Sequence, residues 1–327
     1  MEIGYALSSE EHAPLDLVRN AVSAEDAGFA FSLISDHFHP WTDRQGQSVF
    51  VWGALGAIAA STRSLRVGTG VTCPLVRIHP AIVAQAAATA AALLPGRFFL
   101  GVGTGENLNE HVLGDRWPST AERREMLEEA IDVMRRLWEG ELCSFEGKHY
   151  RVVDARIYTL PDEPIPVVVA AGGPESAKLA GRLGDGLVST APDAELVASY
   201  RDAGGDGPTY GMLTVCWAAT EKEARATALE WWPNGALRGT LGQELPLPSH
   251  FEQAAAMVDE KAIAEAIVCG PDPEAHLQAI RGFAEAGFDH VYVHQVGPDQ
   301  TGFIEFYEKD VLDDATRLEP AMQRVAA

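Results

Sequence analysis

Residues 29–41 read FAFSLISDHFHPW, in which an apolar run passes directly into a carboxylate, two imidazoles and an indole. Residues 29–34 are expected to form a strand, so that Asp36, His37 and Trp41 follow its carboxyl end. In β/α barrels the active site is built at that edge of the strands. The stretch therefore favours a barrel with polar chemistry after its second strand, against the plainer interpretation of a loop whose histidines bind backbone groups.

The rest of the chain alternates short apolar strands with amphipathic helices. Strands are expected over 2–7, 29–34, 65–71, 97–103, 166–171, 186–190, 210–219 and 290–295. Eight such strand–helix pairs predict an α/β fold of the (β/α)8 TIM-barrel type, as a single domain over 1–327. Insertions are expected after the fourth helix, as a β-hairpin within 143–160, and around strands seven and eight, as a loop and helix segment over 233–260. A doubly wound open sheet is the alternative.

Composition and charge limit the class of protein. The chain has 327 residues, 46% of them hydrophobic and 22% charged, as in ordinary globular proteins. A net charge of -22 argues against nucleic acid or an anionic membrane as a partner. No basic leader and no long apolar span is visible, and the four cysteines show no metal-type or disulfide-type spacing. We therefore expect a cytoplasmic enzyme.

Two glycine-rich stretches follow predicted strands. Residues 101–110 read GVGTGENLNE, which lacks the spacing of a dinucleotide-binding fingerprint but lets a flat ring approach the backbone. Glu106 in this stretch is a candidate acid or base, or else an exposed loop carboxylate. Gly172 and Gly173 precede a helix, where free N–H groups suit a phosphate, although a tight turn would need the same residues.

Other catalytic chemistries find little support. No cysteine has an obvious base beside it, and no Gly-x-Ser-x-Gly elbow occurs. His37 and His39 alone would be an incomplete metal site, so we expect no bound metal.

Four motifs in register resemble those of the luciferase-like barrel oxidoreductases: 35–41 (SDHFHPW), 101–110, 170–174 (AAGGP) and 184–186 (GDG). Within that class, the chain looks most like the glucose-6-phosphate dehydrogenases that use coenzyme F-420, a deazaflavin, and the likeness runs almost end to end. The resemblance implies a homodimer that binds this cofactor at the carboxyl ends of the strands. It also implies hydride transfer between the CH–OH carbon of an alcohol or sugar and C5 of the deazaflavin.

The resemblance also assigns roles to particular residues. His37 would take the proton from the substrate hydroxyl, Trp41 would steady the developing charge, and Glu106 would protonate the reduced ring. Glu10 matches a further active-site carboxylate of the family. Contacts to the cofactor are implied for Asp36, Gly70, Val71, Thr104, Gly105, Asn109, Gly172 and Gly173, with a non-proline cis peptide at Gly70–Val71 in the family.

The substrate pocket departs from the family pattern. The glucose-6-phosphate enzymes carry a lysine three positions past the threonine that ends strand six, whereas here Asp193 follows Thr190 at that spacing. Asp289 also stands where a basic residue is expected. Carboxylates would repel a phosphate dianion. We therefore expect a neutral alcohol, sugar or hydroxy-lipid instead of glucose-6-phosphate.

Two other functions fit the same class of barrel. One is a monooxygenase that uses FMN, and the other is a deazaflavin-binding paralogue without catalytic activity. The joint presence of His37, Trp41 and Glu106 favours the dehydrogenase over both. The substrate itself, the physiological direction and the oligomer size are not encoded in any motif.

Overall fold

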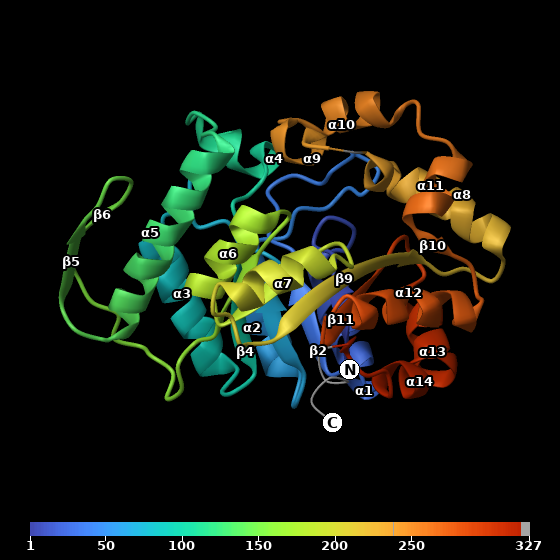
Figure 1. The fold of residues 1–327 in the computed structure, drawn as a ribbon, viewed down its shortest axis with the longest axis horizontal. Helices are drawn as coiled ribbons and strands as arrows, with labels where there is room; N and C mark the ends of the chain where they lie inside the picture. Colours follow the sequence, from blue (N-terminus) through green and yellow to red (C-terminus); the bar gives the residue numbers. More distant parts are fainter. Residues whose placement is uncertain (238, 322–327) are drawn as a thin grey trace.

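Eight parallel strands form a closed barrel in the computed structural model, which describes residues 1–237 and 239–321 (Figure 1). β1 pairs with β2 on one side and with β11 on the other, and the pairing of β8 with β9 completes the circle. The expected (β/α)8 barrel is confirmed. Its strands are β1 (Glu2–Leu7), β2 (Phe31–Ile34), β3 (Arg66–Thr69), β4 (Phe98–Val102), β7 (Val167–Ala170), β8 (Gly186–Ser189), β9 (Thr209–Cys216) and β11 (His290–Gln295).

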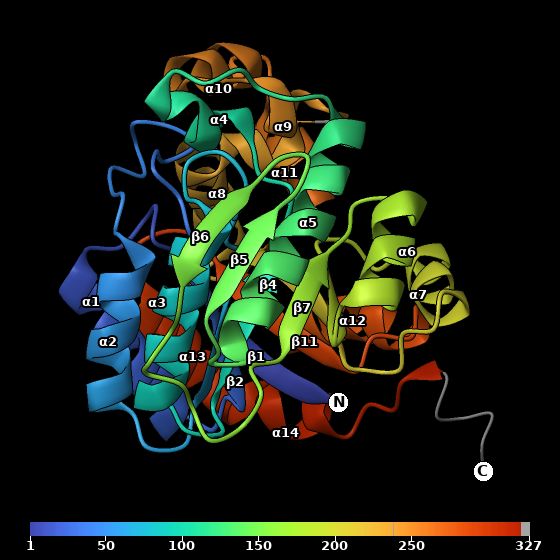
Figure 2. The ribbon, with the colours of Figure 1, turned by 90° about the vertical axis from the view of Figure 1, so that its left-hand side faces the viewer.

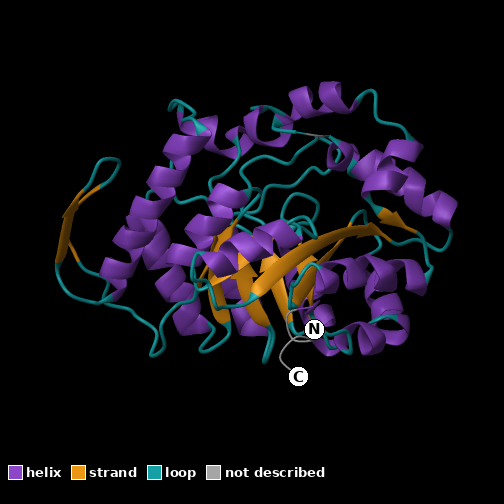
Figure 3. Cartoon of the chain, viewed as in Figure 1, coloured by secondary structure: helices purple, strands orange, loops and turns teal. Residues whose placement is uncertain are grey.

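Helices surround the strands on the outside (Figure 3). α5 shows why they pack there: Ser119 caps its first turn, and Leu127, Ile131 and Met134 are buried on the face that its periodicity predicts. The outer ring consists of α1 (Pro14–Asp26), α2 (Val51–Ser61), α3 (Pro80–Leu93), α5 (Thr120–Trp138), α6 (Pro174–Leu183), α7 (Ala194–Asp202), α8 (Glu221–Trp231), α12 (Pro273–Glu285) and α13 (Gln300–Asp310).

Aromatic side chains fill the interior of the barrel towards the amino ends of the strands. The ring of Tyr210 stacks on Phe99 at 5.2 Å and meets Phe31 edge-on at 5.3 Å. Gly68 makes room for this layer, since any side chain there would overlap the ring of Phe99. His290 lies 4.5 Å from Tyr210 and extends the layer towards the amino ends of the strands. The open space in the barrel is therefore confined to the carboxyl ends.

Two further groups of elements extend the barrel. β5 (Cys143–Glu146) and β6 (Arg151–Ala155) form an antiparallel hairpin that stands away from the barrel in Figure 1. The carboxylate of Glu129 on α5 accepts backbone N–H groups from its turn, among them that of Tyr150 at 2.6 Å. Over the carboxyl ends lie α4 (Asn107–Glu110), α9 (Leu241–Glu244) and α10 (Pro248–Ala255) (Figure 2), with α11 (Glu260–Ala266) at their side.

Some expected boundaries are wrong. The insertion expected as a loop and helix segment over 233–260 contains more helix than that, namely the 3-10 turn Pro233–Ala236, α9 and α10. After the last strand the chain forms two helices, α13 and α14 (Leu312–Thr316), because Val311 between them leaves helical geometry at φ -128°. Helices this short give too few turns for periodicity to be visible in sequence. No described helix is long and apolar enough to cross a membrane.

Candidate active site

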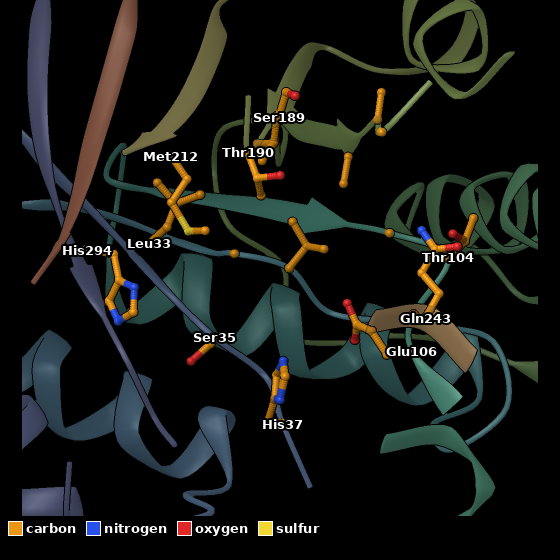
Figure 4. A pocket seen from close by; sticks show the side chains of 18 of the residues that line it. Leu33, Ser35, His37, Thr104, Glu106, Ser189, Thr190, Met212, Gln243 and His294 are labelled. Carbon is orange, nitrogen blue, oxygen red and sulfur yellow. The ribbon is translucent and has the colours of Figure 1, made fainter. Parts of the chain in front are cut away.

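A cavity of about 690 Å³ opens at the carboxyl ends of the barrel strands (Figure 4). The loops that follow β1, β2, β3, β4, β7 and β8 form most of its wall, and His294 of β11 completes the ring. One side is covered by α5 and by four residues that follow α8, namely Trp232, Gly239, Thr240 and Gln243. Of the residues predicted from sequence, the lining includes Glu10, Trp41, His37, Gly70, Val71, Thr104, Gly105, Glu106, Gly172, Gly173 and Thr190.

His37 is held by a buried carboxylate. Its Nε2 lies 3.3 Å from Oε1 of Glu10, and its Nδ1 lies 3.2 Å from the carbonyl oxygen of His39. The hydroxyls of Ser8 and Ser35 donate to Oε2 of Glu10 at 3.1 and 2.5 Å. The sequence therefore places an imidazole of fixed orientation on the cavity wall, after β2.

The charge of Glu10 follows from its surroundings. Burial by itself raises the pKa of a carboxyl, but the adjacent His37 and the hydroxyl of Ser35 outweigh it, so that the pKa of Glu10 lies below its ordinary value. Glu10 is only 2% exposed and is ionised at neutral pH. A proton taken up by His37 is stabilised by this carboxylate. Trp41, whose ring lies 5.0 Å from that of His37, closes the imidazole on one side.

Glu106 brings a second acid–base group to the same space. It precedes the short helix α4 at the end of the β4 loop, and its carboxylate and the ring of His37 both point into the cavity (Figure 4). Nδ2 of Asn109 lies 3.4 Å from its Oε2, and the residue is half-buried. The cavity therefore holds a candidate base and a candidate acid on different strand ends.

The floor of the cavity is apolar. Leu33, Val188, Met212 and Tyr292 project inward from four strands and continue the packed interior of the barrel. Val71 lies among them beside the cis peptide bond Gly70–Val71, the feature that the family resemblance implies. Such a floor suits a flat aromatic ring or an aliphatic group.

A glycine ridge, Gly172–Gly173, forms the opposite end of the cavity at the start of α6. A Cβ atom at either glycine would have no neighbouring atom within 4 Å, so that the backbone borders open space. Gly173 is the N-cap residue of α6 and has no side-chain hydrogen bond of its own. Arg124 of α5 lines this end of the cavity. The pKa of Glu175, in the first turn of α6, is lowered mainly by Lys178 and to a smaller extent by Arg124. Backbone N–H groups, the helix dipole and a guanidinium suit a phosphate or carboxylate.

Two predicted cofactor contacts lie behind the wall instead of lining it. Asp36 is buried, where it accepts hydrogen bonds from Thr72 at 2.8 Å and from Arg77 at 2.9 Å. Oδ1 of Asn109 accepts the N–H groups of Phe38 and His39 at 2.9 and 3.1 Å. Both side chains are used to fix the loop that carries His37, which leaves neither in the described lining of the cavity.

The two carboxylates expected in the substrate pocket lie outside its described lining. Asp193 is exposed and caps α7, accepting the N–H groups of Glu195 and Leu196 at 2.8 and 3.4 Å. Asp289 precedes β11 and accepts the N–H of Thr209 at the start of β9 at 2.8 Å, which places it at the amino ends of the strands. Asp193 therefore lies beside Thr190 but outside the described lining, and the prediction that Asp289 lines the pocket is wrong. A residue that precedes a barrel strand lies at the end opposite to the site.

Several lining residues were not predicted from the sequence. They are Ser35, which holds Glu10, and Arg124, Trp232 and His294. The alternation along β11 contains a signal for His294, because it places Tyr292 and His294 on one face of the strand. No comparable pattern marks Arg124, whose helix is amphipathic for reasons of packing.

The barrel and its cavity define the class to which the chain belongs. The family described as luciferase-like monooxygenase matches residues 1–290, and the chain is a member of it. The predicted family is thereby confirmed.

Three relatives within this class are named as dehydrogenases that depend on coenzyme F-420. A hydroxymycolic acid dehydrogenase of Mycobacterium tuberculosis, named as F-420-dependent, is 41% identical over 322 residues, which cover 95% of this chain and 88% of the relative. An F-420-dependent glucose-6-phosphate dehydrogenase of Segniliparus rotundus is 37% identical over 330 residues, which cover 95% and 97% of the two chains. An F-420-dependent secondary alcohol dehydrogenase, solved with an F-420–acetone adduct, superposes with a TM-score of 0.89 at 32% identity over 97% of this chain and 99% of that one.

Proposed function

We propose that this protein is a coenzyme F-420-dependent oxidoreductase that acts on the CH–OH group of a neutral alcohol, sugar or hydroxy-lipid. One observation carries the proposal: Glu10 and His37 form a buried carboxylate–imidazole pair in the same cavity as Glu106 and the glycine ridge. Relatives from 34% to 41% identical are named as dehydrogenases that depend on this cofactor.

The described residues fit the deazaflavin. Its flat ring matches the apolar floor around Val71, and the open space beside Gly172 and Gly173 leaves room for its side chain. The start of α6 and Arg124 supply positive charge for the anionic tail. When bound, the deazaflavin supplies a carbon that accepts or returns a hydride.

The side chains of this protein handle the protons. His37 takes the proton of the substrate hydroxyl, and the carboxylate of Glu10 stabilises the imidazolium that results. The indole of Trp41 covers the imidazole and excludes water from it. Glu106 would hold the proton that the deazaflavin takes up on reduction. All of these roles require only groups that line the cavity.

The charge of the lining supports a neutral substrate. Among the lining residues within 1–237 and 239–321, Arg124 is the only lysine or arginine, and it belongs to the α6 end. The region around His37 and Trp41 offers imidazole, hydroxyl and indole groups. An alcohol or sugar hydroxyl finds partners there, whereas none of the described lysines and arginines lines that region to pair with a phosphate dianion.

Absorbance of oxidised coenzyme F-420 tests the proposal. We expect the purified protein to bleach it with secondary alcohols or free sugars and much less with glucose-6-phosphate. The His37→Ala variant should bind the cofactor but lose turnover. Bleaching with glucose-6-phosphate alone would refute the substrate class. If the protein instead binds FMN and consumes oxygen in the presence of reduced FMN, the monooxygenase function is correct.

We propose further that the enzyme is a cytoplasmic homodimer. The described cysteines are all free thiols, as suits a reducing compartment. Leu15, Phe50 and Ile82 are exposed at the starts of three neighbouring helices, α1, α2 and α3, where a second copy would cover them. Light scattering on the eluted protein distinguishes a dimer from a monomer.

A further inference from the structure

Two consecutive glutamates hold two imidazoles of the cavity. β1 lies between β2 and β11 in the barrel, and the loop after it carries Glu10 and Glu11. Glu10 contacts His37, which follows β2, whereas Glu11 contacts His294 on β11. Both imidazoles line the cavity, and Figure 4 shows both rings projecting into it. The proposed reaction uses only the first pair.

In the second pair, Glu11 and His294, only Nε2 of the imidazole is hydrogen-bonded within the described residues. Nε2 of His294 lies 2.8 Å from Oε2 of Glu11, and the other carboxylate oxygen accepts the N–H of Gly297 at 3.0 Å. Trp232 lies edge-on to the ring at 4.4 Å. The side chains of Glu11 and His294 are 0% and 4% exposed. The ring therefore cannot turn away from the cavity without leaving a buried carboxylate unpaired.

His276, which does not line the cavity, differs from His294. His276 is fully buried, and both of its nitrogens are used, Nδ1 with the hydroxyl of Tyr307 and Nε2 with the carbonyl oxygen of Gly270, each at 3.0 Å. In residues 1–237 and 239–321, no group is hydrogen-bonded to Nδ1 of His294. This nitrogen remains free for a ligand in the cavity.

The chemistry of that nitrogen identifies what it would bind. When Nε2 pairs with Glu11, Nδ1 is the ring nitrogen left to form a hydrogen bond in the cavity. A hydroxyl group of the substrate both donates and accepts hydrogen bonds and is therefore a matching partner.

We propose that His294, oriented by Glu11, binds a second hydroxyl of the substrate while His37 engages the hydroxyl that is oxidised. The inference rests on the proposed function and deepens it, because it makes the enzyme selective for diols and polyols over simple alcohols. A hydrogen bond lost from a desolvated site lowers the specificity constant by about tenfold, and by more where the partner is charged.

Paired probes that differ by one hydroxyl test the proposal: cyclohexanol and trans-cyclohexane-1,2-diol, with the F-420-loaded enzyme. We expect wild type to favour the diol about tenfold or more in kcat/KM. In His294→Phe, which keeps a ring against Trp232, KM for the diol should rise about tenfold, while kcat and the constants for cyclohexanol stay within about threefold. His294→Gln, with a donor for Glu11 and an acceptor for the hydroxyl, should restore part of the preference.

Each other outcome is decisive. A diol preference that survives in His294→Phe, or an equal loss for both probes, would overturn the proposal. If wild type oxidises neither probe, the proposed function fails for these alcohols, and binding to the cofactor-free protein is measured by saturation-transfer NMR. Weaker diol binding in His294→Phe or, should that variant not fold, in the double variant Glu11→Gln/His294→Phe, which has no unpaired buried carboxylate, still supports the second hydroxyl site. Equal binding in variant and wild type, or no diol binding to wild type, overturns it.

Discussion

Glu10→Gln tests how much the buried carboxylate contributes to proton transfer. When His37 takes the substrate proton, its positive charge lies 3.3 Å from Oε1 of Glu10. At an effective permittivity of about 20, such a pair is stabilised by about 5 kcal/mol. The amide dipole of glutamine retains part of this, so we expect a loss of about 2–4 kcal/mol in the transition state. That corresponds to a fall in kcat of about 30- to 1000-fold.

Steady-state bleaching of coenzyme F-420 measures this effect at saturating alcohol. Glutamine keeps the acceptor for Ser35, so the fold and the affinity for the cofactor should stay unchanged. Glu25→Gln, a change far from the cavity, is the matched control for loss of one carboxylate and should keep the wild-type kcat. A fall in kcat of less than threefold in Glu10→Gln, with cofactor binding intact, would refute the role given to this carboxylate.

Three further changes probe the cofactor site and the frame around it. Gly172→Val should leave the melting temperature within about 2 °C of wild type, because no protein atom lies near the added Cβ. The same change should raise the Kd for coenzyme F-420 at least about tenfold. An unchanged Kd in a fluorescence titration would show that the glycine ridge is not part of the cofactor site. Arg77→Met leaves the buried carboxylates of Asp36 and Glu110 without their cation and should lower the free energy of unfolding by about 3–5 kcal/mol in urea denaturation, whereas a loss below about 1 kcal/mol would contradict this ion network. Burial opposes ionisation of Glu25, but three backbone N–H groups lower its pKa to about 2, below the value of about 4.3 in an unfolded chain. The contribution of this carboxylate to the free energy of unfolding is therefore present above about pH 4.3 and disappears as the pH falls towards 2. Glu25→Gln should therefore be less stable than wild type by about 1–2 kcal/mol at pH 7, with a gap that narrows in acid; a gap independent of pH would refute the assignment.

The sequence predicts the barrel well because strand and helix periods alternate along the whole chain. Residues 29–34 and 35–41 place His37 and Trp41 at the carboxyl end of a strand, and the structure has both in the cavity. Position relative to a strand is therefore readable from sequence. The same rule explains the error for Asp289. Asp289 precedes its strand, β11, and therefore lies at the opposite end of the barrel from His37, which follows β2.

Side-chain direction is what the sequence does not reveal. Asp36 neighbours His37, yet its carboxylate turns to Arg77 and the wall. Glu11 and His294 are 283 positions apart and meet only because β1 and β11 are neighbours in the closed barrel. Pairs of this kind form only when the barrel closes, and no local sequence pattern predicts them.

Transfer of deuterium from alcohol to cofactor is the most direct test of the central claim. The enzyme would be incubated without oxygen with oxidised coenzyme F-420 and a secondary alcohol deuterated at the carbinol carbon. We expect one deuterium per turnover at C5 of the reduced deazaflavin, seen by mass spectrometry and NMR. Reduced cofactor without deuterium, its label lost to water, would contradict direct hydride transfer in this cavity.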